Sequence, residues 1–504
     1  MPKNAGDEMI NNYGAVRNAW MAAAIAAGLA SPASAQSGSS VSTYHGALDR
    51  AGHYVVPGLT YERVRGLHLD ASFHASFEGA VYAQPLLWRE PNSGAGMLIV
   101  ATEDDRVYAL DARSGATIWK RALSAPVASS DLPCGNISPL GVTGTPVIDE
   151  ARATLYLDAA VTRAEGPRHE LFALSLADGS IRSGWPLDVA TAVQGFAPRL
   201  QNQRGALALF DGKVFVPFSG HWGDCGAYHG YVVGVSTADP GKATSFSTRA
   251  RGGGIWGGGG VSGDGKSLFV ATGNTFGANR WGDGEAVFRL GSDLGRPTEN
   301  RDYFAPSDWR ELDGRDLDLG GTAPTPVDVA SANGVRRLIF AIGKSGDGYL
   351  LDRDNLGGFG GALTAAHLTT NIEVASPAVW NADGGVFVAI QGNGAHCPPD
   401  KSGQGLIALN IRVDPAPAIE TAWCGSVAGN GSPIVTTTDG GSDPIVFVVG
   451  AEGDNKLHAF NGETGESLAV PPVQMRGLHH FQTLIATADR LYVAVDGTVY
   501  AFAF

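Results

Sequence analysis

One short phrase recurs along the whole chain, and it constrains the fold more than any other feature. Its clearest copies begin at Val107 (VYALDARSGATIW), Leu171 (LFALSLADGS), Tyr349 (YLLDRDNLGG) and Leu457 (LHAFNGETGE). Weaker copies begin at Tyr231, Ala286 and Leu406, and the chain ends on VYAFAF from Val499 to Phe504. Each copy reads as a strand, a tight Asp/Gly turn and a second strand; the copies start roughly 40 to 65 residues apart, the span of a propeller blade. The eight copies predict an all-β fold, an eight-bladed β-propeller of four-stranded antiparallel blades.

The composition agrees with many short strands. Of the 504 residues 70 are Gly, and only 17% are charged. Gly adopts positive φ without steric cost, which tight turns require. After the N-terminus no long stretch shows helical periodicity. Because a closed ring of blades is one core however many blades it has, residues 36–504 are predicted to form a single propeller domain.

The N-terminus resembles a targeting segment. Arg17 precedes the apolar run 19–30, and Ala33-Ser34-Ala35 fits the small-residue cleavage rule. The run is too short to cross a bilayer, and no later segment is long and apolar enough. We predict a signal peptide over residues 1–35, cleavage near Ala35, and a periplasmic or secreted mature chain without a transmembrane segment. An ordinary N-terminal helix is the alternative.

Charge limits the partners. The net charge is −14, which disfavours nucleic acid because phosphate binding needs clustered cations. A basic redox partner is compatible with this acidity. The sequence lacks C-x-x-C-H, the site of covalent c-type haem, so a separate carrier would have to take up any electrons removed from a substrate.

Four cysteines are widely spaced: Cys134, Cys225, Cys397 and Cys424. In an exported protein an even number of this kind favours disulfides over metal sites. Three connectivities are possible. We prefer Cys134–Cys225 and Cys397–Cys424, and we expect each pair to join neighbouring blades.

Residues 260–267 match the nucleotide-binding pattern G-x-x-x-x-G-K-[ST]. That pattern binds phosphate only as a loop between a strand and a helix. Here the apolar run LFVAT follows it, which reads as a strand. We therefore predict a β-turn and no nucleotide site.

The Gly-rich segment 252–274 carries Trp256 among glycines and Asn274 directly after Thr-Gly. Here the sequence resembles the quinoprotein alcohol dehydrogenases, eight-bladed propellers that bind pyrroloquinoline quinone and a divalent or lanthanide cation near the propeller axis. The resemblance implies that Trp256 is the floor on which the quinone stacks and that Asn274 is a metal ligand. An aromatic plane suits a flat tricyclic cofactor, and an amide oxygen suits a hard cation such as calcium.

Further positions match the same family. Asp316 and Asp318 lie where it carries a catalytic Asp and, in lanthanide sites, a second Asp. Lys344 lies where a family Lys hydrogen-bonds the quinone, and Asp224 is the nearest candidate for a Glu ligand of the metal. Arg204 is a candidate replacement for an Arg that the family has near the cofactor. We interpret four histidines as loop or channel-rim residues: His221, His229, His479 and His480.

The chain also departs from the family. The adjacent Cys-Cys pair that covers the quinone is reduced to Cys134, and the nearby Arg is missing, with Leu140-Gly141 in its place. The motif resemblance covers residues 80–355. Three segments show a closer likeness to exported bacterial PQQ-binding-like β-propeller repeat proteins: YHGALDRAGHYVVPGLT, QNQRGALAL and DLGGTAPTP.

The resemblance implies a dehydrogenase for an alcohol or sugar-type small molecule. The metal would polarise a quinone carbonyl, Asp316 or Asp318 would take the alcohol proton, and Lys344 would stabilise the developing oxyanion. Each residue also fits a structural role: Trp256 in blade packing, Asn274 in a turn, the others on the surface. The competing interpretation is a binding or scaffold propeller without cofactor, and a propeller-type hydrolase or lyase is a third, for which no motif is present.

Overall fold

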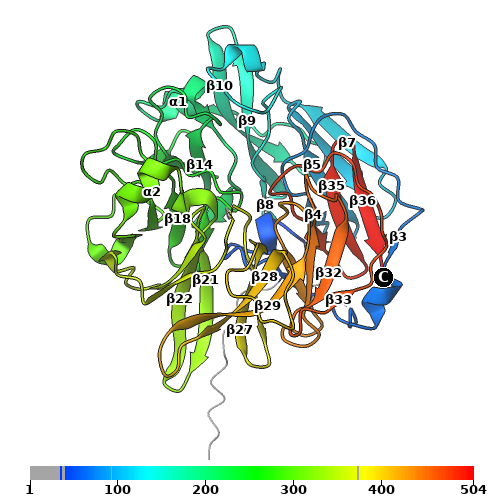
Figure 1. The fold of residues 1–504 in the computed structure, drawn as a ribbon. Coiled ribbons are helices and arrows are strands. Elements are labelled where there is room, and N and C mark those ends of the chain that lie inside the picture. Colours follow the sequence, from blue (N-terminus) through cyan, green and yellow to red (C-terminus); the bar gives the residue numbers. More distant parts are fainter. Residues whose placement is uncertain (1–34, 37–39, 92–93, 372–373) are drawn as a thin grey trace, which may run out of the picture. The chain divides into compact units, whose positions relative to one another are not determined.

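Eight sheets follow one another around a ring in the computed structural model (Figure 1). The structure describes residues 35–36, 40–91, 94–371 and 374–504. The predicted signal peptide, apart from its last residue, lies outside the described residues and stays a prediction. The part of the chain from Ser31 to Phe504 is one unit, and its eight blades, built on four antiparallel strands each, confirm the predicted architecture.

The first four blades use the chain up to β20. Blade 1 contains β4 (Leu86–Arg89), β5 (Gly96–Ala101), β6 (Arg106–Asp111) and β7 (Thr117–Ala122). Blade 2 contains β8 (Val147–Asp149), β9 (Thr154–Arg163), β10 (Gly166–Ser175) and β11 (Leu187–Asp188). Blade 3 contains β12 (Gln201–Asn202), β13 (Ala208–Phe210), β14 (Lys213–Gly220), β15 (Tyr231–Ser236) and β16 (Ala243–Ser247). Blade 4 contains β17 (Ser262–Gly263), β18 (Leu268–Thr272), β19 (Ala286–Leu290) and β20 (Tyr303–Ala305), with β24 (Gly358–Phe359) added in parallel.

The remaining blades follow in the same order. Blade 5 contains β21 (Thr325–Ser331), β22 (Gly334–Ile342), β23 (Asp347–Asp352) and β25 (Thr364–His367). Blade 6 contains β26 (Ala378–Ala382), β27 (Gly385–Gly392), β28 (Gly405–Arg412) and β29 (Ala418–Ser426). Blade 7 contains β30 (Ile434–Thr437), β31 (Ile445–Val449), β32 (Leu457–Asn461) and β33 (Ser467–Leu468), extended by β2 (His53–Val55) and β1 (Ala35–Gln36). Blade 8 contains β34 (Ile485–Ala486), β35 (Arg490–Val495), β36 (Thr498–Ala503) and β3 (His68–Leu69).

Blade 8 closes the ring with strands from both ends of the described chain. β3 pairs antiparallel with β36, His68 opposite Ala503 and Leu69 opposite Phe502, and the two strands lie side by side in Figure 1. An early strand therefore supplies the outer edge of the last blade. Pairing strands from the two ends of the described chain within one blade closes the ring of a propeller.

The repeated phrase reflects how blades pack. All five residues of β18 and all five of β31 are buried, because each blade is covered on both faces by its neighbours. The tryptophans that end two copies of the phrase bind the next blade: Trp119 Nε1 donates to the Leu176 carbonyl, and Trp423 Nε1 to the Gly462 carbonyl, both at 2.9 Å. The phrase therefore encodes contacts between blades as well as strands within them.

Helices are few and short among the described residues. The α-helices are α1 (Val189–Ala192) and α2 (Trp309–Arg315); the 3₁₀ turns are η1 (Tyr44–Gly46), η2 (Arg63–Gly66), η3 (Ser129–Asp131), η4 (Pro198–Leu200), η5 (Asn300–Asp302) and η6 (Leu319–Gly321). Within the described part of the chain, no helix has the length and apolar character needed to cross a bilayer. The phosphate-loop-like segment is the predicted turn, between β17 and β18, where Asp264 Oδ1 accepts the backbone N–H groups of Lys266 and Ser267.

Residues 40–56 cross the centre of the ring and bind the inner strands of several blades. Backbone hydrogen bonds join this segment to blades 1, 2, 4, 6 and 7: Val41–Leu87, Ser42–Ile148, Leu48–Gly263, Ala51–Val379 and Gly52–Val435. Arg50, fully buried, donates to the carbonyls of Leu207 and Val261 at 2.9 and 2.7 Å. Such a fully bonded buried guanidinium ties the segment to blades 3 and 4 as well.

Both preferred disulfides are present. Cys134–Cys225 joins the connection between blades 1 and 2 to a loop of blade 3. The expectation that each pair joins neighbouring blades is wrong for Cys397–Cys424, since Cys397 lies between β27 and β28 and Cys424 lies on β29, all within blade 6. The long β27–β28 loop folds back onto its own blade, which spacing in the sequence does not reveal.

Candidate functional site

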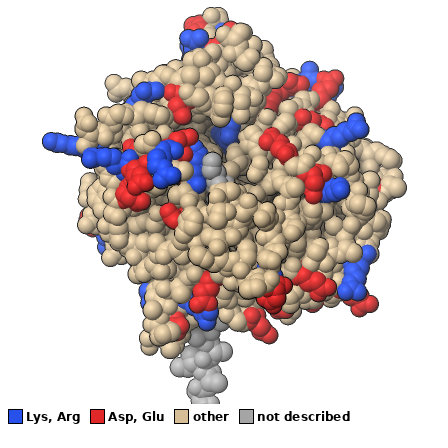
Figure 2. All heavy atoms as spheres, viewed as in Figure 1, with Lys and Arg blue, Asp and Glu red and all other residues tan. Residues whose placement is uncertain are grey.

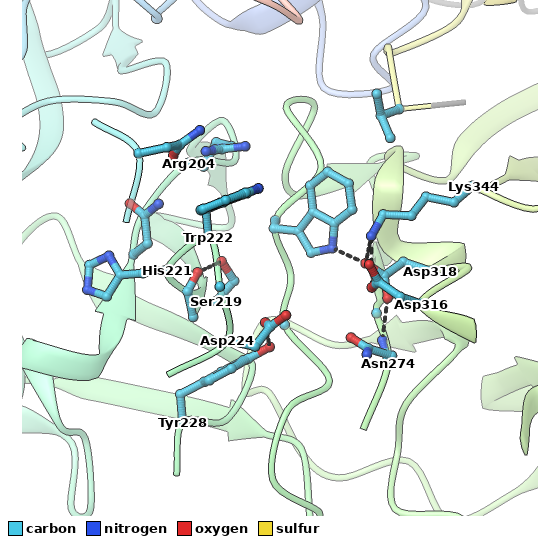
Figure 3. A pocket seen from close by; sticks show the side chains of 18 of the residues that line it. Arg204, Ser219, His221, Trp222, Asp224, Tyr228, Asn274, Asp316, Asp318 and Lys344 are labelled. Atoms are coloured by element: carbon cyan, nitrogen blue, oxygen red, sulfur yellow. Dashed lines mark hydrogen bonds and ion pairs between the residues drawn. The ribbon is translucent and has the colours of Figure 1, made fainter. Parts of the chain in front are cut away.

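Loops that lead into and out of blades 3, 4, 5 and 8 surround a cavity of about 480 Å³. The structure brings all seven residues singled out from the sequence to this cavity: Arg204, Asp224, Trp256, Asn274, Asp316, Asp318 and Lys344. Figure 3 labels all of them except Trp256. Two of the four histidines, His221 and His480, also line it. The chemical roles assigned to these residues stay predictions, because placement alone does not test them.

Asp318 is hydrogen-bonded through both oxygens. Its Oδ1 accepts the backbone N–H of Asn274 at 2.7 Å. Its Oδ2 accepts Trp256 Nε1 at 3.0 Å and lies 2.8 Å from Lys344 Nζ. Burial raises the pKa of Asp318, an effect that Lys344 partly offsets. A buried carboxylate with a raised pKa is suited to accept a proton from a substrate.

Lys344, in the turn between β22 and β23, connects the two acidic residues. Its Nζ lies 3.0 Å from Asp316 Oδ1 and 5.2 Å from the centre of the Trp256 ring. Burial alone lowers the pKa of Lys344, but the charges of Asp318 and Asp316 outweigh it and raise the pKa. Lys344 is therefore a permanent cation at neutral pH.

Asp316 differs from Asp318 in exposure. It ends α2 in the left-handed region, at φ 56°, and its side chain is 63% exposed, against 5% for Asp318. Of the two, Asp318 is the better candidate for a base.

The Gly-rich stretch that carries Trp256 allows its close contact with Asp318. A Cβ on Gly273 would lie 3.0 Å from the Asp318 carboxyl group and 3.1 Å from Trp256 Nε1, so a larger residue there would separate the two side chains. A Cβ on Gly257 would lie 3.0 Å from the Gly321 carbonyl. The glycines thus fix the indole against η6 and leave it half-buried at the cavity.

Asp224 lies across the cavity, on the β14–β15 loop. Its Oδ1 accepts Tyr228 Oη at 2.6 Å, and Figure 3 shows both side chains on the wall opposite Lys344. The Cys134–Cys225 disulfide fixes this loop one residue further on. Asn274 faces the same space, and among the described residues its side-chain amide makes no hydrogen bond.

Arg204 is the cation of the other wall. Its guanidinium carbon lies 5.8 Å from the centre of the Phe481 ring, and Phe481 in turn lies 6.4 Å from the Trp256 ring, centre to centre. Within the described part of the chain, Arg204 has no ion pair and no side-chain hydrogen bond. Burial lowers the pKa of Arg204, yet Arg stays protonated in proteins. A half-buried cation without an acceptor fits an anionic ligand.

Sequence reasoning did not single out Phe481 or Glu285. Phe481 lines the cavity, although no motif marks it. Glu285 lies behind Asp318, fully buried, where its Oε2 accepts the Leu319 N–H at 2.6 Å and its Oε1 has no hydrogen bond. Burial and the charge of Asp318 raise the pKa of Glu285 well above its usual value. The left-handed φ of 51° at Glu285 is a structural signal that the sequence does not show.

A planar quinone with acidic groups fits this cavity, and a metal ion fits it less well. The indole of Trp256 offers a face for stacking, and Arg204 offers an unused cation. Calcium prefers about six to eight oxygen ligands, whereas the described residues include no group of three His, Cys, Asp or Glu side chains placed to hold a metal. The oxygens of Asp318 are already taken by N–H donors. As the side chains lie, the donor set does not fit calcium or a lanthanide ion, and the ligand roles predicted for Asp224, Asn274, Asp316 and Asp318 stay predictions.

Comparison with known proteins gives the class of the fold. A family model described as outer membrane protein assembly factor BamB matches residues 82–243. Quinohemoprotein alcohol dehydrogenase from Comamonas testosteroni has 17% identity and a TM-score of 0.64, with 92% of this chain and 80% of that chain covered. A europium-containing methanol dehydrogenase has 14% identity and a TM-score of 0.64, covering 93% and 98%. BamB from Moraxella catarrhalis has 16% identity and a TM-score of 0.51, covering 87% and 100%.

At such low identity these structures establish the fold, not the activity. The chain has the same β-propeller fold as these alcohol and methanol dehydrogenases, as the resemblance of the sequence indicates. No curated protein sequence matches it significantly. On the face shown in Figure 2, acidic and basic side chains are interspersed, which is unlike the continuous basic surface of a nucleic-acid-binding protein.

Proposed function

We propose that this protein is a periplasmic quinoprotein dehydrogenase that oxidises an alcohol or sugar-type small molecule and passes electrons to a separate soluble carrier. The cofactor is pyrroloquinoline quinone, bound in the cavity beside Trp256. One observation carries the proposal: a single cavity holds an aromatic face, a buried carboxylate bonded to a lysine, and an unpaired guanidinium. The two disulfides support an oxidising compartment.

Each part of the cavity has a task in this proposal. Bound pyrroloquinoline quinone would supply an electrophilic carbonyl that accepts two electrons from the substrate. Trp256 holds the plane of the rings, and Arg204 binds a carboxylate at the far edge, where a charge-assisted hydrogen bond is strongest away from water.

Asp318 and Lys344 handle the proton. Asp318 Oδ2 accepts the hydroxyl proton of the substrate, for which its raised pKa makes it a stronger base than a solvated carboxylate. Lys344 Nζ has three N–H groups, and two of them are directed at Asp318 and Asp316. The third is free to donate to an oxygen that gains negative charge during the reaction.

The test is a titration of the purified chain, starting at residue 36, with pyrroloquinoline quinone. Quenching of Trp fluorescence reports binding, and reduction of an artificial dye in the presence of simple alcohols reports turnover. Saturable quenching that weakens in Arg204→Ala, together with alcohol-dependent dye reduction that Asp318→Asn abolishes, supports the proposal. Absence of quinone binding under all conditions contradicts it.

A propeller that binds a partner protein is the second candidate. The family match over residues 82–243 and the likeness to BamB favour it. In that case the cavity residues would have no role in binding the partner, and replacing Arg204 or Asp318 would leave the function unchanged. A quinone titration without any response, followed by recovery of one partner in cross-linking from periplasmic extract, would favour this candidate.

A further inference from the structure

Lys344 occupies the position in which a cation would have to bind. Its Nζ lies 2.8 Å from Asp318 Oδ2 and 3.0 Å from Asp316 Oδ1, so it bridges the two carboxylates predicted as metal ligands. A divalent or trivalent ion on the same oxygens would stand directly beside this ammonium, and like charges at that distance repel strongly. Lys344 and a metal therefore compete for the same ligands.

The remaining oxygens do not compensate for that competition. Asp318 Oδ1 is held by the Asn274 backbone N–H, and Asp224 Oδ1 by Tyr228. Glu285 does face Asp318 from behind, but it is sealed under η6 by its bond to the Leu319 N–H and does not line the cavity. The side-chain oxygens of the lining without a hydrogen bond include those of Asn202 and Asn274 and the second oxygens of Asp224 and Asp316. Even so, the described residues include no group of three His, Cys, Asp or Glu side chains placed to hold a metal, and calcium prefers about six to eight oxygen ligands.

Lys344 already supplies a positive charge in this region. Lys344 is 16% exposed, and its Nζ lies 5.2 Å from the Trp256 ring centre, at the face on which the quinone is proposed to stack. With two of its three N–H groups on the carboxylates, the ammonium has one left for a carbonyl oxygen of the ligand.

We propose that the cavity binds its quinone without a metal ion, and that the ammonium of Lys344 supplies the positive charge at the reacting carbonyl. This inference rests on the proposed function, because it concerns the same cofactor. It adds that the affinity for the quinone does not depend on calcium or lanthanide ions.

The experiment is a quinone titration of protein stripped of metal by chelation, with residual calcium and lanthanide measured by mass spectrometry. Binding is followed by Trp quenching without added metal, with calcium and with lanthanum. The expected result is the same dissociation constant in all three. Lys344→Met, which keeps the length but removes the charge, should bind at least about tenfold more weakly without metal, in line with the loss of one charged hydrogen bond.

Two controls keep the outcome clear. Lys344→Arg keeps the positive charge and should remain independent of metal. Lys266→Met makes the same replacement in the exposed β17–β18 turn and should bind as the parent does. Thermal melting of each variant establishes that it folds.

Every outcome discriminates. Wild-type protein that binds the quinone only with added metal overturns the inference but leaves the proposed function. Wild-type protein that binds no quinone with or without metal overturns the proposed function itself. If folded Lys344→Met binds as tightly as wild type in the absence of metal, Lys344 does not provide the charge, and the inference is wrong.

Discussion

The two walls of the cavity differ in how their charges are satisfied. On the side of blades 4 and 5, Asp318 meets three N–H donors, and Lys344 meets two carboxylates. On the opposite side, Arg204 contacts the Phe481 ring and, within the described part of the chain, has neither an ion pair nor a side-chain hydrogen bond. The charges of the first wall are paired without a ligand and the guanidinium of the second is not, so we call them the complete and the incomplete wall.

This difference assigns a direction to the ligand. The free-energy cost of burying an unpaired charge is offset only when an anion binds to it. The acidic end of a planar ligand therefore belongs at Arg204. The complete wall is preorganised instead, with a base and a cation held at fixed distances. Preorganised groups stabilise charge that develops during a reaction. The reacting carbonyl therefore belongs beside Lys344.

The largest effect should come from the complete wall. In Asp318→Asn the amide can still accept from Trp256, but it cannot take a proton, so we expect alcohol-dependent dye reduction to fall roughly 100- to 10,000-fold with little change in quinone affinity. Asp313→Asn is a matched control, because Asp313 accepts from the Thr275 backbone N–H at 2.8 Å and does not line the cavity. Undiminished turnover in Asp318→Asn would remove Asp318 as the base.

The incomplete wall should control affinity. Arg204→Ala removes the unpaired guanidinium, and we expect the dissociation constant for the quinone to rise roughly 10- to 100-fold, as for loss of a hydrogen bond to a charged group. Arg204→Lys keeps the charge but not the planar fork, and should show a smaller loss. Equal binding by wild type and Arg204→Ala, measured by Trp quenching, would contradict the contrast between the two walls.

Stacking on Trp256 should have a smaller effect. Trp256→Leu and Trp256→Phe both lose the hydrogen bond to Asp318, so the difference between them isolates the aromatic face. We expect Trp256→Phe to bind the quinone roughly 2- to 10-fold more tightly than Trp256→Leu, the range of an aromatic pair. Calorimetric titration is the suitable measurement, since both variants remove a fluorophore. Identical affinities would show that the ligand does not stack there.

The smallest expected effect concerns pH. Burial raises the pKa of Glu103 to about 7, and the nearby charge of Arg204 lowers it in part. Below that pH Glu103 is neutral and Arg204 is uncompensated; above it the carboxylate offsets the guanidinium. Quinone affinity should therefore decrease as the pH rises through about 7, and Glu103→Gln should flatten this profile between pH 6 and 8, a range chosen to span that pKa.

The same residue affects stability with a defined sign. Because the pKa of Glu103 is raised on folding, its contribution is fully present below the usual value of 4.5 and is lost as the pH rises through about 7. Melting temperatures of Glu103→Gln should therefore fall less than those of wild type over that range. A parallel decrease in both proteins would place the titrating group elsewhere.

The sequence predicted the fold well because the repeat carries it. Each copy of the phrase encodes a strand pair and, at Trp119 and Trp423, a contact with the next blade, so counting copies amounts to counting blades. The main cavity residues were also visible, since Trp256 and Asn274 stand in a distinctive Gly-rich segment. The hydrogen bonds between these residues could not be predicted. Asp318 contacts Trp256, Asn274 and Lys344 at once because Gly273 allows a close approach, which the sequence alone does not reveal.

Other parts of the site leave no trace in local sequence. Phe481 comes from the connection to blade 8 and meets Arg204 of blade 3 only because the ring closes. Glu285 reads as an ordinary residue before a strand, yet it is buried behind Asp318. The Cys397–Cys424 pairing was predicted, but its position within a single blade depends on how one long loop folds back.

The segment 40–56 has a consequence for the size of the ring. It reaches from blade 1 to blade 7 through backbone hydrogen bonds of fixed length, and Arg50 meets carbonyls of two further inner positions. A ring with a different number of blades would place the inner strands at other distances from this segment, so the same set of hydrogen bonds could not form. The segment is therefore matched to a ring of eight blades. Duplication or loss of a blade would require a matching change in residues 40–56, which lie outside the repeated phrase.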